Sequence, residues 1–193
     1  MGRLNIIGIS GSPGTGKKTI GPLVAKVLGW KIVHLNKLAL SGGAVIRRDR
    51  YGFVVDPVRL QNLTVKAIRN GNVVVVGHLL PAVLRRGEVD FVAILRCEPV
   101  ELERRLNRRG YGEEKVRQNV ASEILDVCFV EVLQRFGSRK IGEFDTTRRI
   151  PTEVAAEVVE TFQNRMPRRI GHLNWMLKVY AERKLDHYFP ARV

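Results

Sequence analysis

Cysteine is scarce in this sequence, with only Cys97 and Cys128 among 193 residues. The two lie far apart inside apolar segments, without the close pairing that a cysteine metal site requires. The sequence therefore offers no zinc or iron–sulfur ligand set. We expect both cysteines to be buried free thiols that pack as small hydrophobic side chains.

Long apolar runs are also missing. No segment approaches the roughly 18–20 apolar residues that a membrane-spanning helix needs, which argues against a membrane protein. The first ten residues, MGRLNIIGIS, lead directly into a glycine-rich loop, so a cleavable signal peptide would remove the clearest motif in the chain. We therefore expect a cytoplasmic protein, or a nuclear one if the source is eukaryotic.

Acidic residues are the third shortage, because 19 Asp and Glu face 33 Lys and Arg, which gives a net charge of +14. Such an excess attracts polyanions, nucleic acids first among them, but says little about the fold. The remaining composition is ordinary, with 45% hydrophobic and 27% charged residues. It is typical of a soluble protein with one well-formed core.

Apolar segments rich in β-branched residues alternate with segments of helical periodicity. The strand-like segments are residues 4–9, 31–35, 73–76, 91–95 and 141–144. The third reads VVVV without polar alternation, which is typical of a central parallel strand covered on both faces. The pattern predicts a three-layer α/β fold with a mainly parallel five-stranded sheet.

Proline marks several of the predicted helix starts, at residues 57, 99 and 151. Each follows a strand or a loop and precedes apolar residues at helical spacing. A stripe of apolar residues from Val116 to Val127 predicts one long helix. Residues 39–53 contain three glycines and are expected to be irregular.

Residues 165–193 carry seven Lys and Arg against two acidic residues. A proline at the start of this stretch separates it from the preceding helix. We expect an appended basic C-terminal helix beside a main domain of residues 1–164. Its aromatic residues, Trp175, Tyr180 and Tyr188, either stack on nucleic-acid bases or pack against the domain.

The sequence GSPGTGKKT, residues 11–19, matches most of a phosphate-binding loop, whose pattern is Gly, four residues, Gly-Lys, and then Ser or Thr. Between a strand and a helix, the backbone N–H groups of such a loop surround phosphate, and the lysine adds a cation. The residues expected to bind nucleotide here are Gly11, Gly14, Thr15, Gly16, Lys17, Lys18 and Thr19. A chance glycine turn, or a loop that has lost its function, is the alternative.

The form Gly-x-Pro-Gly-x-Gly-Lys-x-Thr resembles the nucleoside monophosphate kinases, particularly adenylate kinases. Three further stretches resemble the adenylate-kinase-like NTPases of archaea and the eukaryotic nucleus, the coilin-interacting nuclear ATPase type. They are VVVVGH at 73–78, RRLNRRGY at 104–111 followed by Lys115, Asn119 and Glu123, and FDTT at 144–147 ahead of Arg149. Together the resemblance covers roughly residues 4 to 162.

This resemblance implies a P-loop NTPase fold of the nucleoside monophosphate kinase type, with a monophosphate-binding insert at about 36–55 and a short lid at about 108–118. It implies that Lys17, Arg109 and His78 are catalytic, and that Arg149 lies near the nucleotide. The implied ligand is ATP with Mg²⁺, and the implied acceptor is AMP or water. The family's role in small ribosomal subunit assembly implies rRNA and a small-subunit platform ribosomal protein as partners.

Two positions depart from the family pattern. Val76 stands where the family has the strand-end Asp that orders the water shell of Mg²⁺, and Lys18 stands where a phosphate-binding loop ends in Ser or Thr. We therefore assign no direct metal ligand, leave Thr19 as a contact through water, and expect Mg²⁺ to be held weakly. Metal assistance contributes several kcal/mol to phosphoryl transfer, so activity should fall by orders of magnitude if nothing replaces the carboxylate.

Several alternatives stay open from the sequence. The chain is either an adenylate-kinase-like phosphotransferase or ATPase, or a catalytically weak, nucleotide-gated factor that binds RNA or a ribosomal protein; an unrelated small-molecule kinase explains the loop but not the other stretches. His78 either positions a water or a phosphate, or is a hydrogen-bonded structural residue. The two arginine groups also differ: we expect Arg104, Arg105 and Arg108 on a solvated helix face, and Arg47, Arg48 and Arg50 on the phosphate of AMP or of RNA.

Overall fold

A parallel sheet of five strands forms the centre of the computed structural model, which describes residues 4–49, 52–69 and 71–190. The strand order is β2-β5-β1-β6-β7, and every neighbouring pair is parallel. The strands are β1 (Ile6–Ser10), β2 (Lys31–His34), β5 (Val73–Val76), β6 (Phe91–Arg96) and β7 (Ile141–Asp145). All five predicted strands are therefore confirmed, to within two residues at either end.

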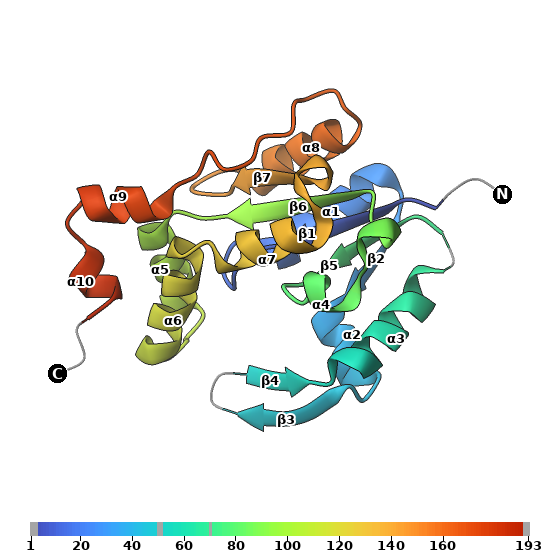
Figure 1. The fold of residues 1–193 in the computed structure, drawn as a ribbon, viewed down its shortest axis with the longest axis horizontal. Coiled ribbons are helices and arrows are strands. Elements are labelled where there is room, and N and C mark those ends of the chain that lie inside the picture. The colour runs from blue at the N-terminus through green and yellow to red at the C-terminus, as the bar shows by residue number, and fades with distance from the viewer. Residues whose placement is uncertain (1–3, 50–51, 70, 191–193) are drawn as a thin grey trace.

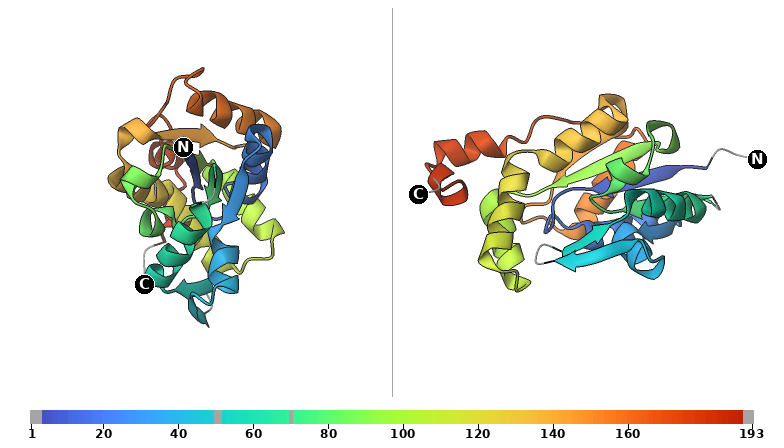
Figure 2. Two further views of the ribbon diagram at one scale, coloured as in Figure 1. Left: turned by 90° about the vertical axis from the view of Figure 1, so that its right-hand side faces the viewer. Right: turned by 60° about the horizontal axis from the view of Figure 1, so that its bottom comes forward.

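Helices cover both faces of this sheet, which gives the three predicted layers (Figures 1 and 2). On one face, α1 (Lys17–Leu28) and α8 (Pro151–Phe162) pack on alternate strand residues such as Val74 and Val76. On the other face, α3 (Pro57–Ile68), α4 (Leu80–Val83) and α7 (Val127–Phe136) pack on the residues between them, such as Val73 and Val75. The run of four valines is fully buried because it has a hydrophobic layer on each side.

The helix starts follow local capping chemistry. Helix α3 (Pro57–Ile68) begins where the Asp56 carboxylate accepts hydrogen bonds from the backbone N–H groups of Val58 and Arg59, with Pro57 in the first turn. The other helical elements are α2 (Leu35–Ser41), α4 (Leu80–Val83), η1 (Arg86–Glu88), α5 (Pro99–Arg108), α6 (Glu113–Ile124), α7 (Val127–Phe136) and η2 (Ser138–Lys140).

Two predictions about local structure are wrong. The apolar stripe from Val116 to Val127 is not one helix, because Asp126 adopts a left-handed backbone conformation (φ 57°) that ends α6 and lets α7 leave in a new direction. The glycine-containing stretch 39–53 is also more regular than expected. It holds the end of α2, the strand β3 (Val45–Asp49) and the start of β4 (Gly52–Val55), and these two strands pair antiparallel as a hairpin.

The C-terminal segment forms two short helices, α9 (Trp175–Ala181) and α10 (Leu185–Tyr188), rather than the single predicted helix. They lie beside α5 and α6, at the same end of the molecule (Figure 1). Trp175 and Tyr188 are buried in a cluster with Leu102 of α5 and Val120 of α6, whereas Tyr180 is 66% exposed. Of the two alternatives for the aromatic residues, packing therefore holds for Trp175 and Tyr188.

In the part of the chain that the structure describes, no helix is both long and apolar enough to span a membrane. Cys97 is buried and Cys128 half-buried, and both are free thiols.

Candidate active site

The loop between β1 and α1 has a backbone that requires glycine. Gly11, Gly14 and Gly16 have φ angles of 135°, 95° and 100°, a region that residues with a side chain rarely adopt. A Cβ atom at Gly11 would also lie 2.2 Å from the carbonyl oxygen of Leu95. The glycine spacing of the motif is therefore a consequence of the loop's shape and of its close approach to β6.

Lys17 closes the loop from the helix side. Its ammonium group donates hydrogen bonds to the carbonyl oxygens of Gly11 (2.5 Å) and Ser12 (2.8 Å). Burial is the largest cause that lowers the pKa of Lys17 to about 8, and the charges of Arg109 and Lys18 lower it further, against the opposing effects of Cys128 and Glu123. At neutral pH the group is still mostly protonated, so it holds a positive charge over the loop.

A pocket of about 160 Å³ opens beside this loop. It is lined by Gly14, Gly16, Thr19, Ile20, Arg105, Arg109, Thr146, Arg149, Pro151 and Val154. Residues from three distant parts of the sequence thus meet here: the loop, the end of α5 and the segment after β7. Five of the residues predicted to bind nucleotide are brought together in one place.

The arginines of this pocket are held differently. Arg149 forms an ion pair with Glu157 of α8 at 2.6 Å, whereas no ion pair involves Arg109 among the residues that the structure describes. Arg109 follows the last residue of α5, so its guanidinium group is free to contact an anion in the pocket.

Arg105 corrects a prediction, because it does not lie on a solvated helix face. Its guanidinium group donates to the Glu101 carboxylate (2.8 Å) and to the hydroxyl (3.1 Å) and carbonyl (2.6 Å) oxygens of Thr146. It therefore fixes α5 to the segment after β7 and forms part of the pocket wall. Arg104, by contrast, has a side chain that is 47% exposed and pairs with Glu101 from the solvent side.

His78 follows β5 and lies outside this pocket. It lines a second, more open hollow of about 540 Å³, together with Leu79, Pro81, Ala82, Glu131, Gln134 and Arg135. Part of its ring is accessible, yet the surrounding protein is the main cause that lowers the pKa of His78 to about 4, with the charge of Lys17 as a second cause. The imidazole is therefore neutral at pH 7, and Lys17 is close enough to affect its protonation.

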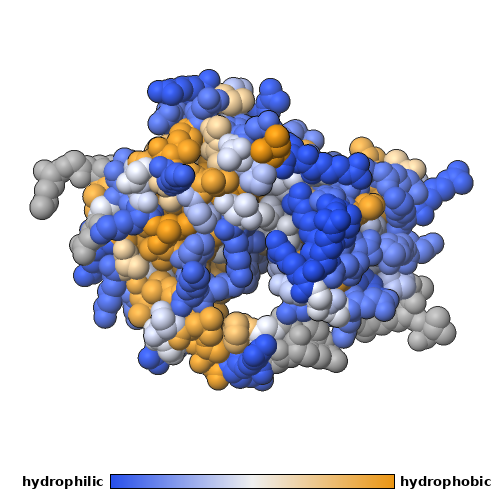
Figure 3. Space-filling view, turned by 180° about the vertical axis from the view of Figure 1, so that it is seen from behind, coloured by the Kyte–Doolittle hydropathy of each residue, from blue (hydrophilic) through white to orange (hydrophobic). Residues whose placement is uncertain are grey.

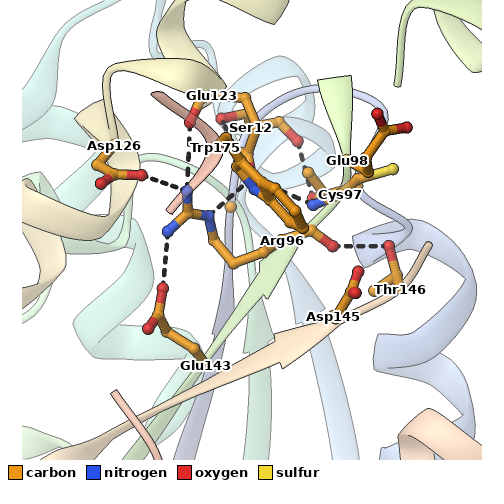
Figure 4. Close-up of polar contacts among 12 residues, drawn as sticks. Ser12, Arg96, Cys97, Glu98, Glu123, Asp126, Glu143, Asp145, Thr146 and Trp175 are labelled. Atoms are coloured by element: carbon orange, nitrogen blue, oxygen red, sulfur yellow. Dashed lines mark hydrogen bonds and ion pairs between the residues drawn. The ribbon is translucent and has the colours of Figure 1, made fainter. Parts of the chain in front are cut away.

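The residues beneath the loop were given no role from the sequence, although Glu123 is one of the positions that carry the family resemblance. Glu123 of α6 is almost fully buried and accepts hydrogen bonds from the Ser12 hydroxyl (2.6 Å), Arg96 Nε (2.7 Å) and Trp175 Nε1 (3.2 Å), as Figure 4 shows. One carboxylate thus joins the loop, β6 and the C-terminal segment.

Arg96 is the cation of this buried network. It also pairs with Glu143 (2.7 Å) and Asp126. Burial alone would lower the pKa of Arg96, but its three carboxylate partners outweigh burial and raise it. The only sequence signal was a charged residue at the end of an apolar strand, FVAILR.

The side of the loop where the resemblance implies magnesium has no acidic residue at the expected place. Val76 is 4% exposed and packs against α1, so that a Cβ atom on Gly21 would lie 2.6 Å from its Cγ2 atom. Lys18 is exposed in the first turn of α1. The described residues also contain no group of three or more His, Cys, Asp or Glu that could hold a metal ion. Val76 and Lys18 therefore do not fit a magnesium ion on this side of the loop, since neither offers it an oxygen ligand.

Comparison with known proteins places the chain in a class. Residues 7–126, more than half of the chain, match the family described as "AAA domain". The fold is similar to that of shikimate kinase from Acinetobacter baumannii (TM-score 0.63, 17% identity, 86% of this chain and 96% of that one). It is also similar to a gluconokinase from Sinorhizobium meliloti (TM-score 0.54, 15% identity, 93% and 99%). The loop and the fold therefore define a P-loop nucleotide-binding protein of the AAA domain family.

Closer relatives narrow this class. The chain is 35% identical to a protein named "Putative adenylate kinase" from Thermococcus kodakarensis, over 92% of this chain and 96% of the relative. It is 36% identical to one of the same name from Pyrococcus furiosus, over 92% and 94%. The chain belongs to this archaeal family of adenylate-kinase-like P-loop NTPases.

Proposed function

We propose that this protein is an ATP-dependent phosphotransferase that converts ATP and AMP to two ADP, with water as a second acceptor. The observation that carries the proposal is the pocket in which the glycine loop meets Arg109 and Arg149. Backbone N–H groups at a helix N-terminus and planar arginine donors are complementary to a transferring phosphoryl group. The names of the archaeal relatives agree with this activity.

Each site residue has a role in this proposal. Lys17 and Arg109 stabilise the negative charge that spreads over the phosphoryl oxygens. Arg149 and Thr19 contact the nucleotide in the pocket. The neutral His78, within the electrostatic range of Lys17, positions the acceptor hydroxyl, phosphate or water. No step is assigned to Mg²⁺, because Val76 and Lys18 do not fit it.

The acceptor side is formed by the insert at about 36–55, within a kinase-like domain of residues 1–164 whose lid is at about 108–118. Arg47 and Arg48 are exposed on the hairpin of this insert, and Arg48 lies over the ring of Phe53 at 5.5 Å; Arg50 lies outside the described residues. Seen from behind, the molecule is hollowed beside this hairpin, with hydrophilic side chains next to the hollow (Figure 3). We assign these arginines to the phosphate of AMP.

The test is ADP formation from ATP alone and from ATP with AMP, in the intact protein and in Lys17→Ala. AMP-dependent ADP production that disappears in the variant supports the phosphotransferase. Slow ADP production that AMP does not change supports an ATPase instead. Tight ATP binding with no turnover contradicts both and leaves the catalytically weak, nucleotide-gated factor.

A second function, in small ribosomal subunit assembly in the cytoplasm, is favoured by the net charge of +14. Binding to rRNA and to a small-subunit platform ribosomal protein would use this charge, including that of the extension 165–193. The test is the salt dependence of RNA binding, whose log–log slope should be about −0.7 per phosphate contact on single strands. A slope near zero would remove RNA as the explanation for the charge.

A further inference from the structure

The first turn of α1 concentrates positive charge, which the buried Glu123 offsets in part at Lys17. Lys17 and Lys18 open the helix, and its first turn has no acidic residue. The helix N-terminus is itself electropositive, so cations there are unfavourable until an anion binds. Lys18 is close enough to lower the pKa values of both Lys17 and His34. Among the described residues, no ion pair involves Lys18.

The neighbouring strand end leaves no room for a compensating acid. Val76 pairs with His34 of β2 and Ile9 of β1, and its side chain fills the space against Gly21, one turn after Lys18. An apolar, nearly closed contact thus occupies the position from which a carboxylate would reach a metal ion. A divalent cation at this place would find no carboxylate at Val76 or in the first turn of α1, where Lys17 and Lys18 both carry positive charge.

We propose that Lys18 supplies, on the β- and γ-phosphates, the positive charge that Mg²⁺ would otherwise provide, so that this protein binds metal-free ATP at least as tightly as its magnesium complex. The inference rests on the proposed ATP site. Metal-free ATP carries more negative charge than its magnesium complex, and an electropositive site without acidic ligands favours the more negative form. Lys18 is therefore a specificity residue for the state of the nucleotide.

The experiment measures ATP affinity by calorimetry in two buffers, one with EDTA and one with excess Mg²⁺. The proteins are the intact chain, Lys18→Thr, and Lys26→Thr as the matched control. Lys26 is exposed in the same helix, so its replacement removes the same charge at a distance from the loop. Lys18→Thr should lose about tenfold or more in affinity in EDTA, the size of one charge-assisted contact, and lose less with Mg²⁺.

The outcomes separate this inference from the function on which it rests. Binding that needs Mg²⁺ in the intact protein, or a Lys18→Thr variant that behaves like Lys26→Thr, overturns the inference alone. No ATP binding in either buffer overturns the proposed ATP site as well. The double variant Lys18→Thr with Val76→Asp should prefer the magnesium complex. Thermal unfolding shows whether this double variant folds. If the buried substitution at Val76 prevents folding, the Lys18→Thr variant alone tests the inference, because position 18 is exposed.

Discussion

The two flanks of the phosphate-binding loop differ in whether their charged side chains are paired. Beneath the loop, Glu123 is buried and both of its oxygens accept hydrogen bonds, from Ser12 on one side and from Arg96, Trp175 and a backbone N–H on the other. Beside the loop, Val76 is a buried apolar residue, and Lys18 is an exposed cation with no ion pair among the described residues. The carboxylate near the loop therefore holds the loop in place, and contact with the ligand is left to cations.

The largest expected effect comes from disrupting the buried flank, which is the hydrogen-bonded network of Ser12, Arg96, Glu123 and Trp175 beneath the loop. Glu123→Ala removes the shared acceptor and leaves Arg96 buried with fewer partners, so the free energy of unfolding should fall by about 3 kcal/mol. Chemical denaturation measures the change. The control is Glu113→Ala, because Glu113 is 94% exposed and pairs with Arg117 at 3.7 Å, and exposed pairs contribute about 0.5 kcal/mol or less. Equal effects of the two variants would refute the structural role of Glu123.

The second prediction concerns the cationic flank, which is the ligand-facing side of the loop with Lys18 and Arg109, and it is measured as enzymatic activity. Arg109→Ala removes a donor that no described ion pair holds, and the rate of phosphoryl transfer should fall about 100-fold or more, as for other donors aimed at developing negative charge. Stability should hardly change, because the side chain makes no described ion pair. Arg108→Ala is the control, since Arg108 is exposed at the end of α5 and does not line the pocket. If both variants kept full activity, the pocket would not be the site of transfer.

A third prediction concerns the pH dependence of ATP affinity. The pKa of Lys17 is about 8 in the free protein, below its ordinary value of 10.5. A bound phosphate favours the protonated form of Lys17, so the contribution of Lys17 to affinity should be complete below about pH 7, and affinity should fall by about fivefold as the pH rises from 8 to 9. Titration calorimetry checks this, and Lys17→Arg should remove the dependence because arginine stays charged. His78, with a pKa of about 4, adds no change between pH 6 and 8.

Local patterns in the sequence were enough to predict the sheet and the loop. The five strands are apolar runs, and the glycine spacing of 11–16 is dictated by backbone shape, so both are visible in adjacent residues. The break at Asp126 was missed because apolar residues keep their helical spacing on both sides of it. The hairpin of the insert was missed because its strands have only five and four residues and their pairing is irregular between Val45 and Arg47.

The buried flank of the site could not be predicted for a different reason. Glu123 is 111 residues from Ser12 and 52 residues from Trp175 along the chain, and the contact between Arg105 and Thr146 spans 41 residues. No periodicity links positions so far apart, because their contact follows from how the helices pack on the sheet. The cationic flank was visible in advance, since Val76 and Lys18 stand at motif positions where other residues were expected.

The smallest expected effect tests whether the C-terminal segment contributes to the buried flank through its hydrogen bond. Trp175→Phe keeps most of the apolar contact with α6 but removes the indole N–H that donates to Glu123 at 3.2 Å. The free energy of unfolding should fall by about 1 kcal/mol, the net contribution of one hydrogen bond, and thermal unfolding measures it. Tyr180→Phe, at an exposed position of the same helix, should change nothing. In a Glu123→Gln background the effect of Trp175→Phe should shrink, because hydrogen bonds to a charged acceptor are the stronger ones. An unchanged effect would assign the stabilisation to packing alone, and would make the buried flank a contact between the loop and β6 without the C-terminal segment.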